Sequence, residues 1–599
     1  MIRILQIWCY IFLTTYLTGT GAVNLLRRFA CGVRRGNPAP LLSPGAASMA
    51  GLVFTTVYAQ AWSLLGAVGA AANLGLMALC VLSGIACFPQ IAETFIGFRV
   101  GPDWRSPSPE KESSAAGADI LRFLRMCGIA VLVLFYAYGT SRGYMHTDTI
   151  LYHAQSIRWA EEAGAVPGLA LLHNRLGYNS AAFPLTALFS FPYVFGQSYH
   201  CVGGYLALLV MLECMRVLRL FPSLVLKGRE RGDSPGISVF VRIAGIYYLL
   251  TIYDEMISPA SDYFMVCIGF YIVIRFLGLL EKSEKDPFPY ALLSMAAVWN
   301  ITMKLSAAPF ILLAVFPVCL YVRRKTARPI IVFVLCAILI ALPFLARNVI
   351  LTGYLLYPYP AIDLFDLPWK IDAGYARSDQ MEIAVWGRGY TDVYQYHAPL
   401  SYWVPGWFMS QSPLHRILLI LDAAAVPGIA AFAGKRAARR SIEGSGLAVV
   451  CASTVGGLIF WFASAPLMRY GCVYVYLTAV LFAALLWEHL AGRLSGRKAR
   501  VFARVFALFM LAFFLWKGVS FGRELVGMWR QDGATYLTEQ KDYPDVSCTP
   551  YEIDGITFYH ADGKGTSYEA FPSSPFPARI RLRRTGLEGG FVPENGGQN

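Results

Sequence analysis

The chain has 599 residues, of which 56% are apolar and only 15% carry a charged side chain. Soluble domains are about 45–50% apolar and about 25% charged, so this composition excludes an ordinary water-soluble protein. The formal charge of +14 comes mostly from short basic blocks between long apolar runs, a membrane pattern that argues against nucleic acid as a partner.

Fourteen apolar runs have the length and continuity of transmembrane helices, because about 20 apolar residues cross a hydrocarbon core. None shows the alternation of a membrane barrel strand. The first run is directly followed by Arg27 and Arg28 and is typical of a span rather than a cleaved signal peptide. The predicted runs are 3–22, 47–67, 71–96, 119–139, 203–221, 236–254, 262–280, 288–302, 305–322, 329–346, 415–433, 446–464, 470–490 and 501–519. The stretch 288–322 is left open as one broken helix or two short ones.

The basic residues predict the orientation of these spans. Seven loops hold 25 Lys and Arg residues, whereas the short loops on the opposite side hold almost none, so we expect the basic loops in the cytoplasm. Those loops are 23–46, 97–118, 222–235, 281–287, 323–328, 434–445 and 491–504. Segments 140–202, 347–414 and 520–599 then lie outside. The chain divides into N-terminal spans (1–118), a transmembrane core (119–519) and a C-terminal module (520–599).

The first outside segment predicts an amphipathic helix along the membrane surface. Thr147 or Asp148 is a good helix N-cap, and apolar residues recur behind it at three- or four-residue spacing. The plainer interpretation of Asp148 is that of a cap. The functional one is a carboxylate at the exit of a span that meets a lipid-borne substrate. His146 and His153 lie nearby and are more typical of structural residues.

Further along the chain, Tyr253–Asp262 forms a tight turn with three carboxylates at a membrane boundary. The segment Ser258–Asp262 either simply caps the next helix or supplies a second acid, preferably Asp262, that orients an acceptor or a divalent ion. Loop 347–414 is rich in Tyr, Trp and Asp, which suits interfacial anchoring and equally sugar binding. The tail 520–599 reads as a small β-rich module, with strands at 556–559 and 579–583 and a hairpin-type turn at Asp562–Gly565.

Three cations break the charge asymmetry on the outside face. Lys304 and Arg469 lie in short turns, and Arg347 follows the span 329–346. They either snorkel to lipid headgroups or bind the phosphate of a lipid substrate. Tyr470, His153 and Arg158 complete the predicted substrate- and phosphate-binding set, and Asp148 and Asp262 are the predicted catalytic residues.

Several short motifs occur in an order that resembles the GT-C superfamily of membrane glycosyltransferases and a poorly characterised bacterial family of polytopic membrane proteins. They are Asp148–Trp159, Asn300–Ser306, Arg347-Asn348 followed by Gly353–Pro358, and Ala465–Tyr470. The resemblance implies a catalytic acid in the first large outside loop and a polyprenyl-phosphate-linked sugar donor. This chain departs from the commonest GT-C pattern by placing three spans before that loop. It also has Thr147-Asp148 where a paired acidic dipeptide is common. The sequence therefore does not decide whether the protein binds a metal, and a divalent cation stays open as a cofactor.

Together these features predict an α-helical polytopic membrane protein of about 14 transmembrane helices, GT-C-like, with a small β-rich C-terminal extramembrane module. We expect a glycosyltransferase of the bacterial plasma membrane that transfers a sugar to a glycan or lipid acceptor on the non-cytoplasmic face. Asp148 is the expected general base. Two alternatives stay open: a transporter or flippase for a lipid-linked saccharide, and a glycan polymerase or ligase.

Overall fold

The structure is a computed structural model that describes residues 1–32, 42–93, 115–142, 146–219, 236–256, 258–438, 441–493, 496–544, 546–563 and 565–594. Of the basic loops predicted in the cytoplasm, 222–235 and most of 97–118 lie outside the described residues.

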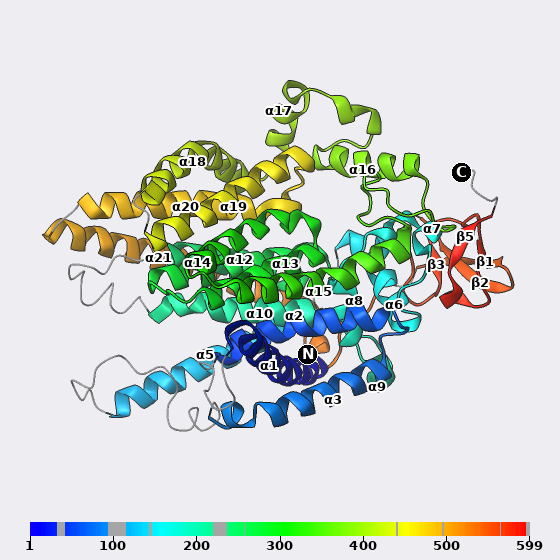
Figure 1. The fold of residues 1–599 in the computed structure, drawn as a ribbon, viewed down its shortest axis with the longest axis horizontal. Coiled ribbons are helices and arrows are strands. Elements are labelled where there is room, and N and C mark those ends of the chain that lie inside the picture. Colours follow the sequence, from blue (N-terminus) through cyan, green and yellow to red (C-terminus); the bar gives the residue numbers. More distant parts are fainter. Residues whose placement is uncertain are drawn as a thin grey trace.

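Within the described residues, each of the fourteen predicted apolar runs overlaps one or two helices (Figure 1), while residues 94–96 and 220–221 of these runs lie outside the described residues. The stretch 288–322 is a broken helix: an α-helix ends at Met303, Lys304 is extended, and a 3-10 helix follows. The helices of these runs are α1 (Ile2–Cys31), α2 (Pro44–Ser63), α3 (Ala70–Ala86), α5 (Ala115–Arg142), α10 (Val202–Cys214), α11 (Ile237–Thr251), α12 (Ser261–Glu281), α13 (Pro287–Met303), η6 (Leu305–Ala314), α14 (Val315–Arg323), α15 (Ala327–Thr352), α18 (Pro413–Ala438), α19 (Ile442–Ser464), α20 (Met468–Arg493) and α21 (Gly496–Asp532).

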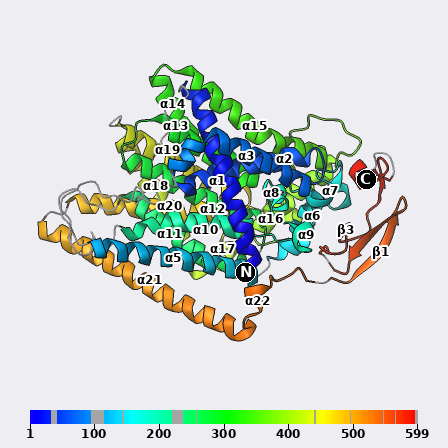
Figure 2. The ribbon, with the colours of Figure 1, turned by 90° about the horizontal axis from the view of Figure 1, so that it is seen from below.

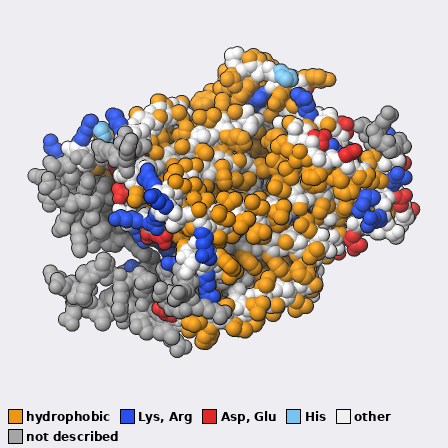
Figure 3. Space-filling model, viewed as in Figure 1, with side chains coloured by type: hydrophobic (Ala, Val, Ile, Leu, Met, Phe, Trp, Pro, Cys, Tyr) orange, Lys and Arg blue, Asp and Glu red, His pale blue; other side chains and the backbone are white. Residues whose placement is uncertain are grey.

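Eight helices of the described chain are long and apolar enough to cross a membrane. They are Phe123–Arg142, Ser261–Glu281, Leu305–Arg323, Ala327–Thr352, Pro413–Lys435, Ile442–Ser464, Met468–Ala491 and Arg504–Asp532. The surface agrees with this, since a broad hydrophobic belt separates two ends that carry the charged side chains (Figure 3). The protein is therefore an α-helical membrane protein with a small β region at its C-terminus.

The core of the bundle forms around α12, which packs against α10, α11, α13, α19 and α20. At the periphery, α21 runs along α5 (Figure 2), and the rings of Phe135 and Phe521 meet with centroids 4.8 Å apart. Close backbone contact joins α1 and α2: a Cβ at Gly19 would lie 1.9 Å from the Ala47 carbonyl oxygen. Small residues allow such close packing where water supplies no hydrophobic driving force between helices.

The predicted surface helix is present but is not a surface helix. It begins as a π-helix, η1 (Thr149–His153), and continues as α6 (Ala154–Glu162). Ile157 and Ala160 are buried on one face, and Gln155 and Trp159 are buried on the other, because the C-terminal module covers that second face. The helix is therefore enclosed on both sides.

Shorter elements complete the end of the bundle at which α12 and α20 begin, which we call the site end. This end carries α16 and the C-terminal module in Figure 1. Its short helices are α7 (Leu169–Leu172), η2 (Asn174–Gly177), α8 (Ala182–Leu188), α9 (Pro192–Phe195), η5 (Tyr253–Glu255), α16 (Ala373–Gly387), η7 (Val393–His397), α17 (Leu400–Ser410) and α22 (Thr535–Thr538). The opposite end, where α10 and α12 finish, is the far end; there η3 (Met215–Arg219) follows α10.

The C-terminal module holds β1 (Cys548–Ile553), β2 (Ile556–Ala561), β3 (Ser573–Ser574), β4 (Ile580–Leu582) and β5 (Phe591–Pro593), with η8 (Leu587–Gly589) before the last strand. The strands form sheets of order β1-β2-β3 and β4-β5.

Three features of this module differ from the sequence prediction. β1 was not predicted. The hairpin turn lies at Asp554-Gly555, whose positive φ angles suit a tight hairpin, and not at Asp562–Gly565. Helix α21 also continues to Asp532, so the β region begins later than residue 520.

Candidate functional site

Asp148 is the N-cap residue of η1, yet its side chain makes no capping hydrogen bond. Its Oδ2 instead accepts a hydrogen bond of 2.6 Å from Nη2 of Arg469. The two residues are 321 positions apart in the chain. Asp148 therefore occupies the cap position without making a capping bond, and its carboxylate is bound by Arg469 instead.

Arg469 is the second residue of α20 and links several groups at the site end. Its Nε lies 4.0 Å from Oδ2 of Asp262, and its guanidinium also contacts the ring of His146. The guanidinium carbon lies 5.2 Å from the centroid of the Tyr470 ring. One arginine thus touches both predicted catalytic acids.

Lys304 completes the cluster from the break between α13 and η6. Its ammonium pairs with Asp262 and lies 3.8 Å from the centroid of the Tyr470 ring. Asp262 is in the first turn of α12, whose N-cap is Ala260 without a side-chain bond. The cap position of α12 thus falls within the predicted segment Ser258–Asp262, while the Asp262 carboxylate pairs with Lys304 and makes no capping bond. We call Asp148, Asp262, Lys304, Arg469 and Tyr470 the charge cluster.

The charge cluster is balanced, with two carboxylates and two cations. Its cations are the more exposed members, since the side chains of Arg469 and Lys304 are 29% and 20% exposed, against 16% for Asp148 and 8% for Asp262. The N-termini of α12 and α20 also lie here, and helix N-termini favour negative charge. The site end can thus receive an anion while keeping acids behind it.

Two histidines line this cluster. The backbone N–H of His146 donates to the Ser258 hydroxyl at 2.6 Å, which ties the start of the segment 146–202 to the turn before α12. Burial, and next the Arg469 charge, lowers the pKa of His146 below its ordinary value. His153 is 2% exposed and packs between the rings of Tyr152 and Phe183, and burial lowers its pKa strongly. His153 thus lies next to the cluster as a neutral, packed side chain.

Arg347 does not belong to the charge cluster. Helix α15 continues to Thr352, so Arg347 lies inside a helix and does not follow a span as predicted. It is 3% exposed and donates to the Ser63 hydroxyl at 2.6 Å and to Oδ1 of Asn179 at 3.2 Å. These contacts hold α2 and the segment 146–202 against α15, which is a structural role.

Arg158 is also placed elsewhere, because it binds the C-terminal module. Its guanidinium donates to the carbonyl oxygens of Tyr568 and Glu569 and stacks on the rings of Tyr568 and Phe571. We call residues 566–571 the tail strap. The strap lies along η1 and α6, since Thr566 donates to the Ile150 carbonyl and Gln155 donates to the Ser567 carbonyl.

A buried carboxylate that the sequence did not single out lies at the site end, where Tyr178 links it to Tyr152. Asp379 of α16 is 3% exposed and accepts hydrogen bonds from Tyr178 at 2.5 Å, Tyr357 at 2.7 Å and Asn174 at 3.2 Å. Burial raises the pKa of Asp379. The Tyr178 ring in turn contacts Tyr152. The many aromatic residues of loop 347–414 pointed to this loop as a whole, but they did not distinguish Asp379 from its other residues.

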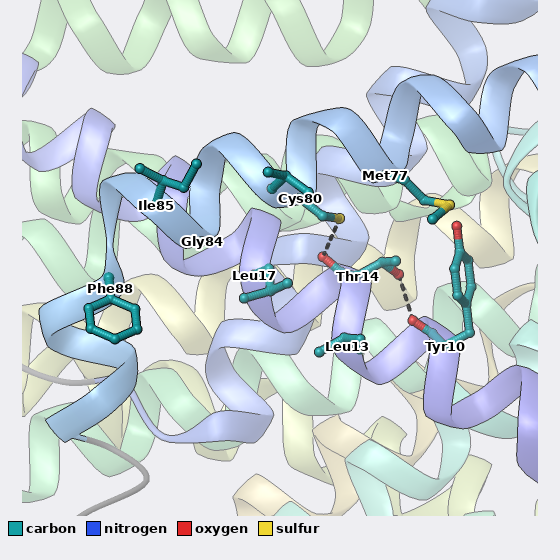
Figure 4. A pocket seen from close by; sticks show the side chains of 10 residues that line it. Tyr10, Leu13, Thr14, Leu17, Met77, Cys80, Gly84, Ile85 and Phe88 are labelled. Atoms are coloured by element: carbon teal, nitrogen blue, oxygen red, sulfur yellow. Dashed lines mark hydrogen bonds between the residues drawn. The ribbon is translucent and has the colours of Figure 1, made fainter.

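The structure also contains an apolar groove of about 620 Å³ between α1 and α3, lined by residues such as Leu13, Leu17, Met77 and Phe88 (Figure 4). No member of the charge cluster lines it. With regard to metals, no group of three His, Cys, Asp or Glu residues in the described ranges is placed to hold an ion. Asp148 and Asp262 are both engaged by cations instead.

Comparison with curated proteins finds no match. A family model described as "Domain of unknown function (DUF8201)" matches residues 1–108 and 111–476. The matched part holds every member of the charge cluster, and the C-terminal module follows it. Because the match covers most of its length, the chain belongs to the DUF8201 family.

Proposed function

We propose that this protein is a membrane glycosyltransferase that moves a sugar from a polyprenyl-phosphate-linked donor to a glycan or lipid acceptor. One observation carries the proposal: Asp148 and Asp262 meet Lys304 and Arg469 at one end of the bundle, although the four residues come from four separate elements. The ends of spans are at the depth where a lipid phosphate lies with its chain in the bilayer.

The cations of the charge cluster bind the phosphate of the donor. Arg grips phosphate in a bidentate manner, and Lys acts as a point charge. When Arg469 turns to the phosphate, its bond to Asp148 is released, so the carboxylate becomes a free base only when the donor is bound. This order protects the site from unproductive proton transfer.

Asp148 then removes the proton of the acceptor hydroxyl. The acceptor oxygen forms a bond to the anomeric carbon, the bond from that carbon to the phosphate oxygen breaks, and the lipid phosphate leaves with the electron pair. The configuration at the anomeric carbon is inverted. Lys304 and Arg469 stabilise the charge on the departing phosphate, and the protein supplies proximity and deprotonation.

The topology belongs to the same proposal. We place the site end and the C-terminus on the non-cytoplasmic face of a bacterial plasma membrane, with about fourteen spans in a GT-C-like arrangement. The concentration of basic residues in the far-end loops supports this orientation. Reporter fusions after Asn599 and within 373–387 are expected to be active only outside the cytoplasm, and a fusion at Lys325 only inside it.

The test of the transferase is Asp148→Asn in a deletion strain complemented with the full chain. Loss of a general base costs about 10²–10⁴-fold in rate, so lipid-linked donor accumulates and the modified glycan disappears in mass spectra. Asp372→Asn is the matched control, because Asp372 caps α16 at the same end. Wild-type glycans in the Asp148→Asn strain would contradict the proposal.

One observation favours a second candidate, a flippase for a lipid-linked saccharide. Asp422 of α18 is 2% exposed within a candidate span and forms no ion pair among the described residues, and buried ionisable groups of this kind mark transport pathways. Purified protein in vesicles decides between the two. A flippase moves a labelled lipid saccharide between leaflets, and Asp422→Asn stops it. A polymerase or ligase is separated from a single-sugar transferase by the length of the product.

A further inference from the structure

At the far end, three arginines from neighbouring elements surround one carboxylate. Glu213 near the end of α10 lies within ion-pair distance of Arg242 on α11 (3.0 Å), Arg216 of η3 (3.2 Å) and Arg275 on α12 (3.7 Å). We propose that this arginine triad, with Glu213 at its centre, is a binding site for a phosphate group, separate from the charge cluster.

The triad carries an uncompensated charge. Three guanidinium groups and one carboxylate leave +2, and within the described ranges the ion pairs of all three arginines are made with Glu213. Among the described residues, the charged and titratable groups that act most on Arg216 are Glu213, Tyr271 and the other two arginines, so Glu213 is the main acid that faces it there. This net charge of +2 is confined to one small site, so a bound anion would stabilise it by supplying the counter-charge.

The triad is also open to a ligand. The side chains of Arg216 and Arg275 are 34% and 28% exposed, whereas Glu213 is 8% exposed and lies behind them. Nη1 of Arg275 lies 3.7 Å from the Glu213 carboxylate. A guanidinium carries five N–H groups in a planar fork, so the groups of Arg275 that do not face Glu213 can make the bidentate contact that guanidinium makes with phosphate.

The triad lies nearer to the far end of the bundle than to the charge cluster. Arg242 is five residues from the start of α11, and Arg275 is six residues from the end of α12. At 1.5 Å per residue, each is about 8–9 Å from the helix end, a distance over which a long arginine side chain can extend towards the headgroup layer. Arg275 and Asp262 lie on the same helix about 20 Å apart. The phosphate site is thus separate from the charge cluster, and it does not depend on the proposed transferase activity.

The phosphate comes either from an anionic lipid of that leaflet or from a soluble phosphate compound. Native mass spectrometry of the delipidated full chain in detergent distinguishes them by titration with phosphatidylglycerol and with inorganic phosphate. Arg216→Gln/Arg275→Gln removes the two exposed arginines and leaves Arg242 paired with Glu213. Arg323→Gln/Lys325→Gln is the matched control, because it removes two exposed charges from another far-end element.

We expect the triad variant to weaken phosphatidylglycerol binding at least tenfold while the control binds like wild type. Competition by inorganic phosphate would show a soluble source, and its absence a lipid source; both support the site. The variant Glu213→Gln raises the local charge and should tighten binding, which keeps the proposal testable if the double variant does not fold. Equal binding by the triad variant and the control would overturn the proposal, because diffuse charge would then explain the affinity.

Discussion

We expect Asp148→Asn to tighten the binding of the donor and at the same time to abolish transfer of the sugar. Asp148 Oδ2 lies 2.6 Å from Nη2 of Arg469, so a phosphate held by the same guanidinium is about 6 Å from that carboxylate. Two unit charges at this distance repel by about 3 kcal/mol at an effective dielectric constant of about 20. Exposure of both side chains lowers the effect to about 1–2 kcal/mol.

The variant should therefore bind polyprenyl phosphate about 5–30-fold more tightly than wild type, although it no longer transfers the sugar. Binding of polyprenyl phosphate to the purified protein is followed by tryptophan fluorescence in detergent. Arg469→Gln should show the reverse, with weaker binding and an intact bundle. If Asp148→Asn binds the donor more weakly than wild type, Asp148 is not a competitor for Arg469, and the charge cluster has been interpreted wrongly.

Three further predictions follow from single contacts. Arg347→Met should lower the stability by about 2–4 kcal/mol, since two hydrogen bonds to a buried charge are lost; thermal unfolding in detergent measures this, with exposed Arg323→Met as the unaffected control. Burial raises the pKa of Glu255 to about 7 from an ordinary value of 4.5. The folded protein therefore retains a proton that the unfolded chain releases between pH 4.5 and 7, and stability falls as pH rises through that window. Glu255→Gln should remove this fall, and parallel pH–stability curves would refute the assignment. Arg158→Ala should release the tail strap, seen as faster proteolysis within 540–594 while the bundle stays resistant; unchanged cleavage would show that Arg158 does not hold it.

The sequence predicted the helices well because continuous apolar runs require a helix in a membrane. It also placed Lys304 and Arg469 at one boundary, since a basic residue on the sparsely charged side is conspicuous. The sequence did not predict which side chains contact one another. In the sequence, Arg347 and Arg469 are both basic residues at the end of an apolar run. Only the structure shows that the guanidinium of Arg347 already donates hydrogen bonds to Ser63 and Asn179.

Contacts across long stretches of chain account for the other differences. The strap that covers α6 comes from residues 566–571, so a helix whose pattern is amphipathic is buried on both faces. Asp379 was missed for the same reason, because two of its three donors, Asn174 and Tyr178, lie more than 200 positions earlier in the chain. Local pattern gives the elements, whereas these partners are decided by tertiary packing.

The tail strap has a consequence for folding during synthesis of the protein. Thr566 donates to the Ile150 carbonyl, two residues after Asp148 and 416 positions earlier in the chain. At about 5–20 residues per second, roughly 20–80 s of synthesis separate the two residues. The helix that carries Asp148 therefore waits for the last part of the chain before it is fully enclosed. A chain that stops before residue 566 lacks the strap over η1 and α6.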